Sequence, residues 1–284
     1  MPRRRSNTQM FALPAPPPGR LSVAGRAYAL RRVFKHDFFA ATCLYEAEPG
    51  LAGGGFPRIV VKIYRVQGFC GLPGEWMGRL SRDHEKGIYA ALAGVAGVPR
   101  YVGDVGGTGL AIEYIDAAPL DHLDAPPAGY FDRLRAVFDA VHARGVAYSD
   151  ANKRSNILVT DDGRPFLIDF QIALRPRPDW PWPARPMLAS FIRYLQGKDI
   201  YHLCKHKRRL APAELSAEED ALSRRRSGWH LLHRRLTKPY RTLRRRLLAD
   251  RYRAGRIVSP TADLEDHELP EQETYSYGLA DLFI

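Results

Sequence analysis

Two short apolar runs near the middle of the chain, NILV (156–159) and PFLI (165–168), constrain the fold most strongly. The residues TDDGR between them are a strong hairpin signal, so the two runs are predicted to pair as adjacent strands. Asn156 stands where the first strand begins and Asp169 stands just after the second, so the hairpin brings these side chains together. Asp150 lies on the loop that leads into the hairpin, after an amphipathic helix. A fold of this chain therefore has to place three oxygen-bearing side chains near one another.

These three side chains indicate a particular chemistry. Oxygen ligands at converging strand ends suit a hard cation such as Mg²⁺, which prefers a few protein oxygens together with phosphate and water. A further carboxylate beside them can orient a hydroxyl nucleophile and accept its proton. Asn156 and Asp169 are therefore the candidate metal ligands, and Asp150 is the candidate catalytic residue.

The flanking sequence predicts how the rest of the chain is organised. The first part is rich in strands, and RIVVKIY puts alternate residues on opposite faces. Ser81 is expected to cap the helix that follows. After Gln171 the chain becomes Pro-rich and then helical. The predicted class is α+β, with a β-rich lobe, a helical lobe and a basic C-terminal extension. Its predicted strands cover 28–34, 41–46, 58–64 and 109–115, and its predicted helices cover 81–92 and 131–145.

The order of these features resembles the protein-kinase-like superfamily, whose pattern is His-Arg-Asp…Asn…Asp-Phe-Gly. The block GVAYSDANKRSNILVTDDGRPFLIDFQIA (145–173) carries the resemblance. Within the superfamily the chain is most similar to bacterial lipopolysaccharide (Kdo/heptose) kinases and to RIO-like kinases. The resemblance covers about residues 28–205. It implies a two-lobed kinase-like fold that binds ATP and Mg²⁺.

The resemblance also implies a role for individual residues. Lys62 would hold the α- and β-phosphates of ATP, and Glu85 would pair with that lysine. Asp150 would be the catalytic aspartate, with Lys153 near the transferred phosphate. The remaining matched positions are Asn156 and Asp169 as metal ligands, Glu113 to Ile115 as the hinge that binds adenine, and Asp199 as the buried aspartate that braces the catalytic loop.

The chain departs from the family pattern at several positions. Tyr148 replaces the usual histidine, Ser149 the arginine and Gln171 the glycine. The missing arginine implies activity that needs no activation-loop phosphate. The segment 34–45 contains no glycine, although three of its side chains, Lys35, His36 and Thr42, are expected to be able to contact phosphate. Because atypical and small-molecule kinases share these departures, they affect the expected acceptor more than the fold.

Charge is distributed very unevenly along the chain. The net charge of +12 is concentrated between Tyr201 and Arg256, where 17 Lys/Arg stand against 5 Asp/Glu. The basic amphipathic stretch 229–255 either packs its apolar stripe on the core or lies on an anionic membrane surface. We do not expect nucleic acid as a partner, because recognised RNA-binding motifs are absent. The expected organisation is a flexible extension over 1–26, an N-lobe over 27–115, a C-lobe over 116–210, a basic helical segment over 211–256 and an acidic tail over 257–284.

These observations together predict an ATP- and Mg²⁺-dependent kinase. The favoured acceptor is a sugar hydroxyl of lipopolysaccharide or another lipid-linked glycan, and the alternatives are a RIO-like Ser/Thr protein kinase and a catalytically inactive kinase-like scaffold. No apolar run approaches the ~20 residues that span a bilayer, and three scattered cysteines favour a reducing compartment. We therefore expect a cytoplasmic protein. A peripheral position at the inner face of the cytoplasmic membrane is compatible with this expectation.

Overall fold

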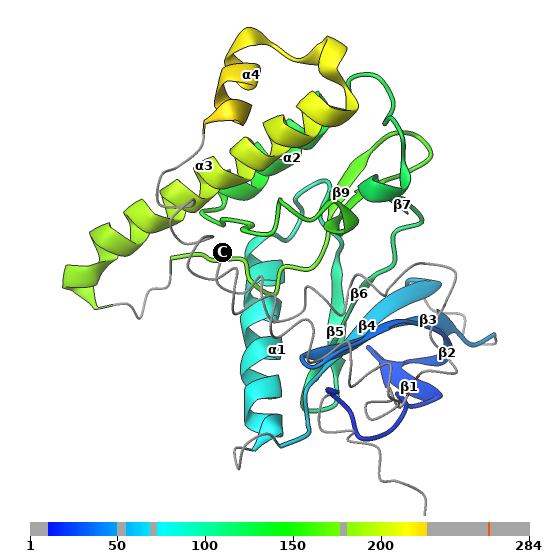
Figure 1. Ribbon diagram of the computed structural model, residues 1–284. Helices are drawn as coiled ribbons and strands as arrows, with labels where there is room; N and C mark the ends of the chain where they lie inside the picture. Colours follow the sequence, from blue (N-terminus) through cyan, green and yellow to red (C-terminus); the bar gives the residue numbers. More distant parts are fainter. Residues whose placement is uncertain (1–10, 50–54, 69–72, 177–180, 226–260, 262–284) are drawn as a thin grey trace, which may run out of the picture. The chain divides into compact units, whose positions relative to one another are not determined.

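The computed structural model describes residues 11–49, 55–68, 73–176, 181–225 and 261, and its chain divides into two compact units (Figure 1). The first unit includes residues up to Asp83 and Val102–Tyr114, and the second comprises His84–Tyr101 and Ile115–Arg225. A β-rich first unit and a largely helical second unit confirm the predicted α+β class. Thr261 belongs to the first unit. The remaining residues after Arg225, which include most of the predicted basic segment and acidic tail, lie outside the described residues.

The first unit is built on a six-stranded sheet with the order β1-β2-β3-β4-β6-β5. The neighbouring pairs from β1 to β6 run antiparallel. Within β4 the predicted alternation holds only at first: Ile59 and Val61 are fully buried in the core of this unit, but Lys62 and Tyr64 on the opposite face are buried as well. The six strands are β1 (Arg20–Val23), β2 (Arg26–His36), β3 (Ala40–Ala47), β4 (Arg58–Tyr64), β5 (Tyr101–Val105) and β6 (Gly109–Glu113).

The N-terminal residues differ from the expectation of a flexible extension over 1–26. Phe11 is 1% exposed and Ala12 is fully buried in the core of the first unit. The Ala12 carbonyl accepts a hydrogen bond from the Val66 amide, and β1 adds a strand to the sheet edge. The expectation is therefore wrong for the second half of that segment, which supplies both core and sheet.

Arg65 explains why this segment packs where it does. Its side chain is buried, and Nη1 donates to the carbonyl oxygens of Phe11 and Phe38. The guanidinium also lies 3.9 Å from the centroid of the Phe38 ring, a favourable cation–π distance. Burial lowers the pKa of Arg65. One cation thus joins the N-terminal segment to the turn between β2 and β3.

Helix α1 (Gly74–Ala91) begins seven residues earlier than predicted, so Ser81 lies inside it and is not its cap. Gly74 and Gly78 in the first turns make this start hard to predict from the sequence, since glycine disfavours helix interiors. Gly78 has a packing reason: a Cβ there would stand 2.2 Å from the Arg65 carbonyl oxygen. Glu85 and Ile88 in the second half are both 1% exposed.

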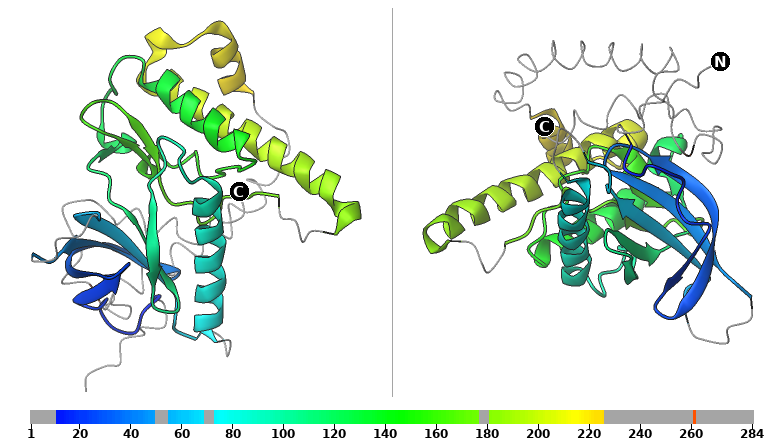
Figure 2. Two further views of the ribbon diagram at one scale, coloured as in Figure 1. Left: turned by 180° about the vertical axis from the view of Figure 1, so that it is seen from behind. Right: turned by 90° about the horizontal axis from the view of Figure 1, so that it is seen from below.

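The second unit contains the predicted helix and the predicted hairpin. In α2 (Tyr130–Ala143) the stripe expected to be buried is buried, namely Phe131, Leu134, Val137, Phe138 and Val141. Strands β8 (Ile157–Val159) and β9 (Pro165–Leu167) pair antiparallel, and β7 (Ala118–Pro119) adds to β8. Helix α3 (Arg185–Leu210) runs beside α2 in both Figures 1 and 2. The remaining elements are α4 (Ala217–Arg224), η2 (Leu120–His122), η3 (Arg154–Asn156), η4 (Trp182–Ala184) and η5 (Pro212–Glu214).

Candidate active site

The loop between α2 and β8 carries three of the predicted site residues, Asp150, Lys153 and Asn156. The Lys153 amide donates to the Asp150 carbonyl, and the Asn156 amide donates to the Lys153 carbonyl, so two successive turns space these residues three apart. Asp150 is 5% exposed. Its Oδ2 accepts from Lys153 Nζ at 3.0 Å and from Asn156 Nδ2 at 2.7 Å. An ammonium and an amide thus fix the orientation of one buried carboxylate, as charge-assisted hydrogen bonds do well.

The hairpin brings Asp169 to the same end of the unit as Asn156. The Ile168 amide donates to the Asn156 carbonyl at 3.0 Å, so the two ends of the hairpin are joined directly. Asp169 follows with a φ of +60° and is half-buried. A left-handed backbone is uncommon for a residue other than glycine, and such conformations cluster at functional sites.

Tyr148 ties the loop to the hairpin from inside the unit. It is fully buried, and its hydroxyl donates to the Ile168 carbonyl and lies 3.3 Å from the Asn156 carbonyl oxygen. Its ring packs edge-on against Phe138 and Phe170. Burial, and next the carboxylate of Asp150, raise the pKa of Tyr148 well above its usual value, so the hydroxyl remains a donor. The sequence marks Tyr148 only as a departure from the family pattern and not as this tie.

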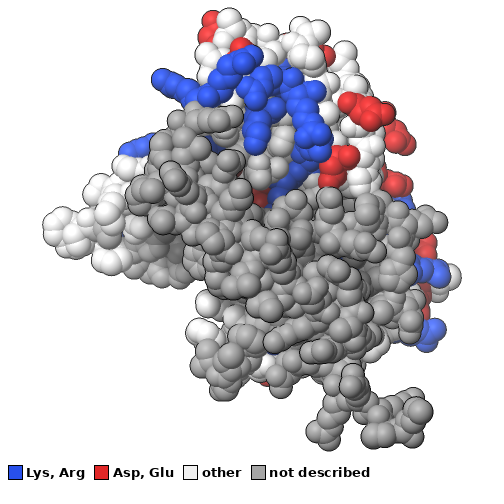
Figure 3. Space-filling model, in the orientation of Figure 1, with Lys and Arg blue, Asp and Glu red and all other residues white. Residues whose placement is uncertain are grey.

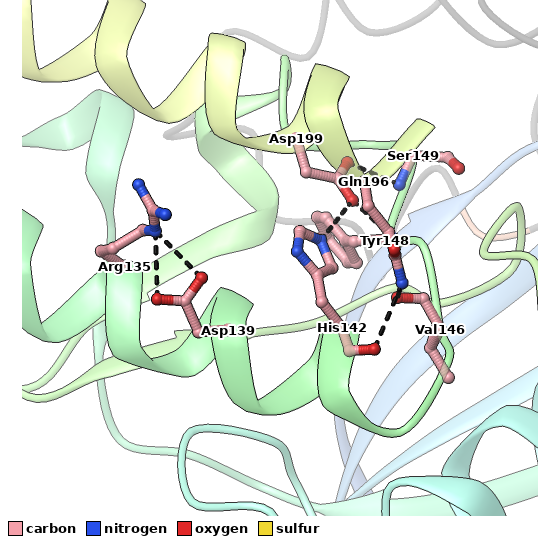
Figure 4. Close-up of polar contacts among 8 residues, drawn as sticks. All are labelled: Arg135, Asp139, His142, Val146, Tyr148, Ser149, Gln196 and Asp199. Atoms are coloured by element: carbon pink, nitrogen blue, oxygen red, sulfur yellow. Dashed lines mark hydrogen bonds and ion pairs between the residues drawn. The ribbon is translucent and has the colours of Figure 1, made fainter. Parts of the chain in front are cut away.

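Helix α3 holds the residues just before Asp150 through Asp199 (Figure 4). Asp199 Oδ1 accepts from the Ser149 amide at 2.8 Å. Its Oδ2 accepts from the Tyr148 amide at 2.8 Å and from His142 Nε2 at 3.0 Å. This is the bracing arrangement that the resemblance implies for Asp199. Burial raises the pKa of Asp199, although the three hydrogen bonds oppose that rise.

Two further side chains of α3 contact the same stretch of backbone. Gln196 Nε2 donates to the carbonyl oxygens of His142 and Val146 (Figure 4). His206 Nε2 donates to the carbonyl of Ala151, the residue after Asp150, at 2.8 Å. Burial lowers the pKa of His206 to about 4, so the ring is neutral at neutral pH. The helix therefore supports the loop on both sides of Asp150.

The remaining residues predicted for nucleotide binding are divided between the two units. Lys62 is 8% exposed on β4, opposite Thr42 of β3, and its Nζ lies 5.4 Å from the Tyr64 ring centroid. Glu113 ends β6 in the same unit. Glu85 and Ile115 belong to the second unit, where Glu85 is buried and Ile115 is half-buried. The roles of these four residues toward ATP stay predictions.

The expectation that His36 can contact phosphate is wrong. His36 is 1% exposed, and its Nε2 accepts a hydrogen bond from the Leu13 amide at 3.1 Å. Its Nδ1 lies 3.0 Å from the Thr261 hydroxyl. This imidazole is part of the core of the first unit. The neighbouring Lys35 forms an ion pair with Asp37 at 2.8 Å.

The donor set of the second unit fits a magnesium ion. Asn156 uses its amide nitrogen on Asp150, which leaves its side-chain oxygen as an acceptor. Asp169 supplies a carboxylate at the same hairpin end. Within the described part of the chain, no group of three or more His, Cys, Asp or Glu side chains could hold a metal ion. A site with two protein oxygens suits an ion that keeps water and takes phosphate oxygens as ligands, which is the habit of Mg²⁺.

Comparisons with known proteins give structural neighbours only. No family model matches the chain, and a search of curated proteins found no match. Among solved structures, the chain is similar to the Rio2 kinase from Chaetomium thermophilum, with 20% identity and a TM-score of 0.48 over 67% of this chain and 59% of that one. It is also similar to the ADP/Mg²⁺-phosphoaspartate complex of that kinase, with 18% identity and a TM-score of 0.48 over 67% and 58%. The chain thus aligns with less than two thirds of the length of either neighbour, and the chemistry open to it rests on its own side chains.

Proposed function

We propose that the protein is a kinase that transfers the γ-phosphate of ATP, with Mg²⁺, to an acceptor hydroxyl. One observation carries the proposal: a buried carboxylate, Asp150, is held by Lys153 and Asn156 at the hairpin end where Asp169 lies. Phosphoryl transfer requires little covalent chemistry from the protein, so positioning and charge neutralisation dominate its catalysis. A preorganised set of one carboxylate, one ammonium and two oxygen ligands supplies both.

Each side chain has a definite task in this proposal. Asp150 orients the acceptor hydroxyl and accepts its proton as the new P–O bond forms and the bond between the γ-phosphorus and the leaving ADP breaks. Lys153 places a positive charge where negative charge accumulates on the transferred group. Asn156 and Asp169 would hold Mg²⁺, which when bound offsets the charge of the triphosphate. Lys62 of the first unit would bind the α- and β-phosphates, with Glu85 of the second unit as the residue that orients it.

For the acceptor we propose a sugar hydroxyl of a lipid-linked glycan, such as the inner core of lipopolysaccharide. The resemblance to lipopolysaccharide kinases and the basic stretch over 201–256 support this acceptor, since a lipid anchor would present the sugar at an anionic membrane face. No helix among the described residues is long and apolar enough to cross a bilayer. A protein Ser/Thr acceptor is the alternative, because the same constellation serves any hydroxyl.

The central test is Mg²⁺-dependent turnover of ATP by the purified full-length chain. Asp169→Ala is expected to lower the rate by at least about 10²-fold, because it removes a carboxylate ligand at the reacting phosphate. The matched control is Asp162→Ala, which removes an exposed aspartate from the turn of the same hairpin and leaves the rate within about twofold. Equal rates for the wild type and Asp169→Ala, or turnover that needs no divalent metal, would refute the proposal.

The acceptor is tested separately. Labelled ATP is incubated with the protein and either a membrane glycolipid extract or a soluble protein extract. Label in the glycolipid fraction that disappears with Asp150→Asn supports the sugar acceptor. Label confined to Ser or Thr of soluble protein favours the RIO-like alternative, and a protein without turnover or Mg²⁺-dependent nucleotide binding is a scaffold.

A further inference from the structure

A group of cations lies beside the catalytic loop of the second unit. Arg154, Lys205 and Arg209, here called the basic cluster, lie on the two elements that His206 joins: Lys205 and Arg209 are its neighbours on α3, and Arg154 stands three residues after Ala151. After burial, the charge of each of the three also lowers the pKa of His206. His206 in turn donates to the carbonyl of Ala151. Lys205 and Arg209 are exposed one turn apart on α3, and Arg154 is half-buried at the start of η3. Two elements therefore bring three positive charges to the side of the loop that carries Asp150.

The basic cluster differs from most other charged side chains on the described surface, because its charges are not compensated. Within the described ranges, none of its three members has a carboxylate partner or a side-chain hydrogen bond. Figure 3 shows Lys and Arg gathered on one face over the C-terminal half of α3 and over α4. Elsewhere in the described structure, arginines form ion pairs, including Arg31–Glu46, Arg79–Glu75, Arg135–Asp139, Arg164–Asp162 and Arg224–Asp220.

Uncompensated like charges repel one another, so an arrangement that keeps them together favours a bound anion. Two guanidinium groups and one ammonium can surround a phosphate group, because guanidinium matches the geometry of phosphate oxygens. The cluster covers one helical turn of α3 and the start of η3. A nucleic acid strand needs a longer basic groove with aromatic side chains for stacking its bases.

We propose that the basic cluster is a subsite for a phosphate group carried by the acceptor, and that the acceptor is a phosphorylated sugar. The proposal rests on the proposed kinase function, since it defines which hydroxyl-bearing molecule reaches Asp150. A phosphate held at Arg154, four residues after Asp150, fixes the acceptor while the hydroxyl to be phosphorylated faces the catalytic carboxylate. The acceptor is thereby selected by a charge that it already carries.

The test uses inositol hexakisphosphate as a soluble probe rich in phosphate, titrated calorimetrically into the full-length protein with saturating Mg²⁺ and a non-hydrolysable ATP analogue. The triple variant Arg154→Gln/Lys205→Gln/Arg209→Gln is expected to bind the probe about 30-fold more weakly, at roughly threefold for each cation removed. The control Arg31→Gln/Arg79→Gln/Arg164→Gln removes the same charge from exposed sites and should bind within about twofold of the wild type. Equal weakening in the two variants overturns the proposal, because net charge alone would then explain binding.

Failure of this subsite can be distinguished from failure of the kinase function. Binding of the ATP analogue is measured on the same proteins and is expected to be equal in the wild type and both triple variants. A wild type that binds no nucleotide refutes the kinase function, whereas unchanged probe binding by the first variant refutes only the subsite.

The source of the phosphate is tested by displacing the bound probe. Displacement by glucose 6-phosphate identifies a free sugar phosphate as sufficient, and displacement only by a phosphorylated glycolipid in micelles identifies a lipid-linked source. Both results support the phosphate subsite. Displacement by single-stranded RNA at lower concentrations than by either sugar phosphate overturns the assignment to a sugar.

Discussion

Tyr148 shows how a single buried side chain can connect two segments of the candidate site. Its hydroxyl bonds the hairpin at Ile168, while its backbone amide is held by Asp199. The loop that carries Asp150 and the strand end that carries Asp169 thus share one anchor. A phenol can do this across a wide pH range only if it keeps its proton, and burial ensures that by raising its pKa.

Tyr148→Phe tests this anchor through the pH dependence of stability. Because the folded pKa of Tyr148 is raised, the unfolded chain loses this proton near pH 10 while the folded chain keeps it. The wild type should therefore lose stability as the pH rises above about 10, and Tyr148→Phe should lose up to about 1.4 kcal/mol less between pH 10 and 11. At pH 8 the variant should be less stable by about 1 kcal/mol, since one buried hydrogen bond is missing. Urea unfolding at the three pH values measures both effects, and parallel pH profiles for the two proteins would contradict the assignment.

At the residue scale the sequence predicts which side chains form the candidate site better than it predicts their backbone conformations. Asp150, Asn156 and Asp169 can be grouped because a recognisable hairpin joins them over a short stretch. The left-handed backbone of Ser149, with a φ of +67° and a hydroxyl buried without a hydrogen-bond partner among the described residues, leaves no signal in residue types. Such strain is maintained by the surrounding contacts, here the hydrogen bonds that two successive amides donate to Asp199.

At the scale of elements, the sequence does not predict which face of α3 points inward. The stripe that faces the loop and α2 carries polar residues, while the exposed stripe of its first half is apolar. A hydrophobic pattern would therefore place the helix with the wrong face inward. Its inward stripe is Ile192, Gln196, Asp199, Leu203 and His206, and its exposed stripe is Met187, Phe191 and Tyr194.

The pH dependence of the free energy of unfolding tests the contact that His206 makes between α3 and the loop. Its pKa is about 4 in the folded protein against about 6.5 in an unfolded chain, so protons favour the unfolded state below about pH 6.5. The free energy of unfolding should fall by about 2 kcal/mol between pH 7.5 and pH 5 on account of this group, and level off below pH 4. His206→Gln, which retains an N–H donor and does not titrate, should lack this contribution. His122→Gln removes an exposed imidazole and serves as the control; a pH profile of His206→Gln identical to that of the wild type would sink the idea.

The largest scale is that of the whole chain, where the predicted nucleotide site draws on both units. The second unit is the easier one to predict, because its candidate catalytic and metal-binding residues lie close together between residues 148 and 170. The first unit is predicted less completely. Residues 11–23 contain prolines and no strand-length apolar run, yet they supply core residues and β1. The buried hydrogen bond from Arg65 to the Phe11 carbonyl, which holds the start of this segment, is revealed by no local pattern.

A double-mutant cycle on Lys62 and Asp169 tests whether the two units act on one nucleotide. If Lys62 contacts the phosphates that Asp169 reaches through Mg²⁺, each residue neutralises part of the same charge, and the loss of one changes the effect of the other. Lys62→Met and Asp169→Asn should each weaken Mg²⁺–ATP binding by about tenfold or more. The factor by which the double variant weakens Mg²⁺–ATP binding should differ by at least about threefold from the product of the factors for the two single variants. Isothermal titration of the four proteins supplies the cycle, and the exposed pair Arg31→Gln and Asp162→Ala provides a cycle in which no coupling is expected. A double variant whose loss equals that product would mean that Lys62 and Asp169 do not share a ligand, and the nucleotide site would then have to be sought within one unit.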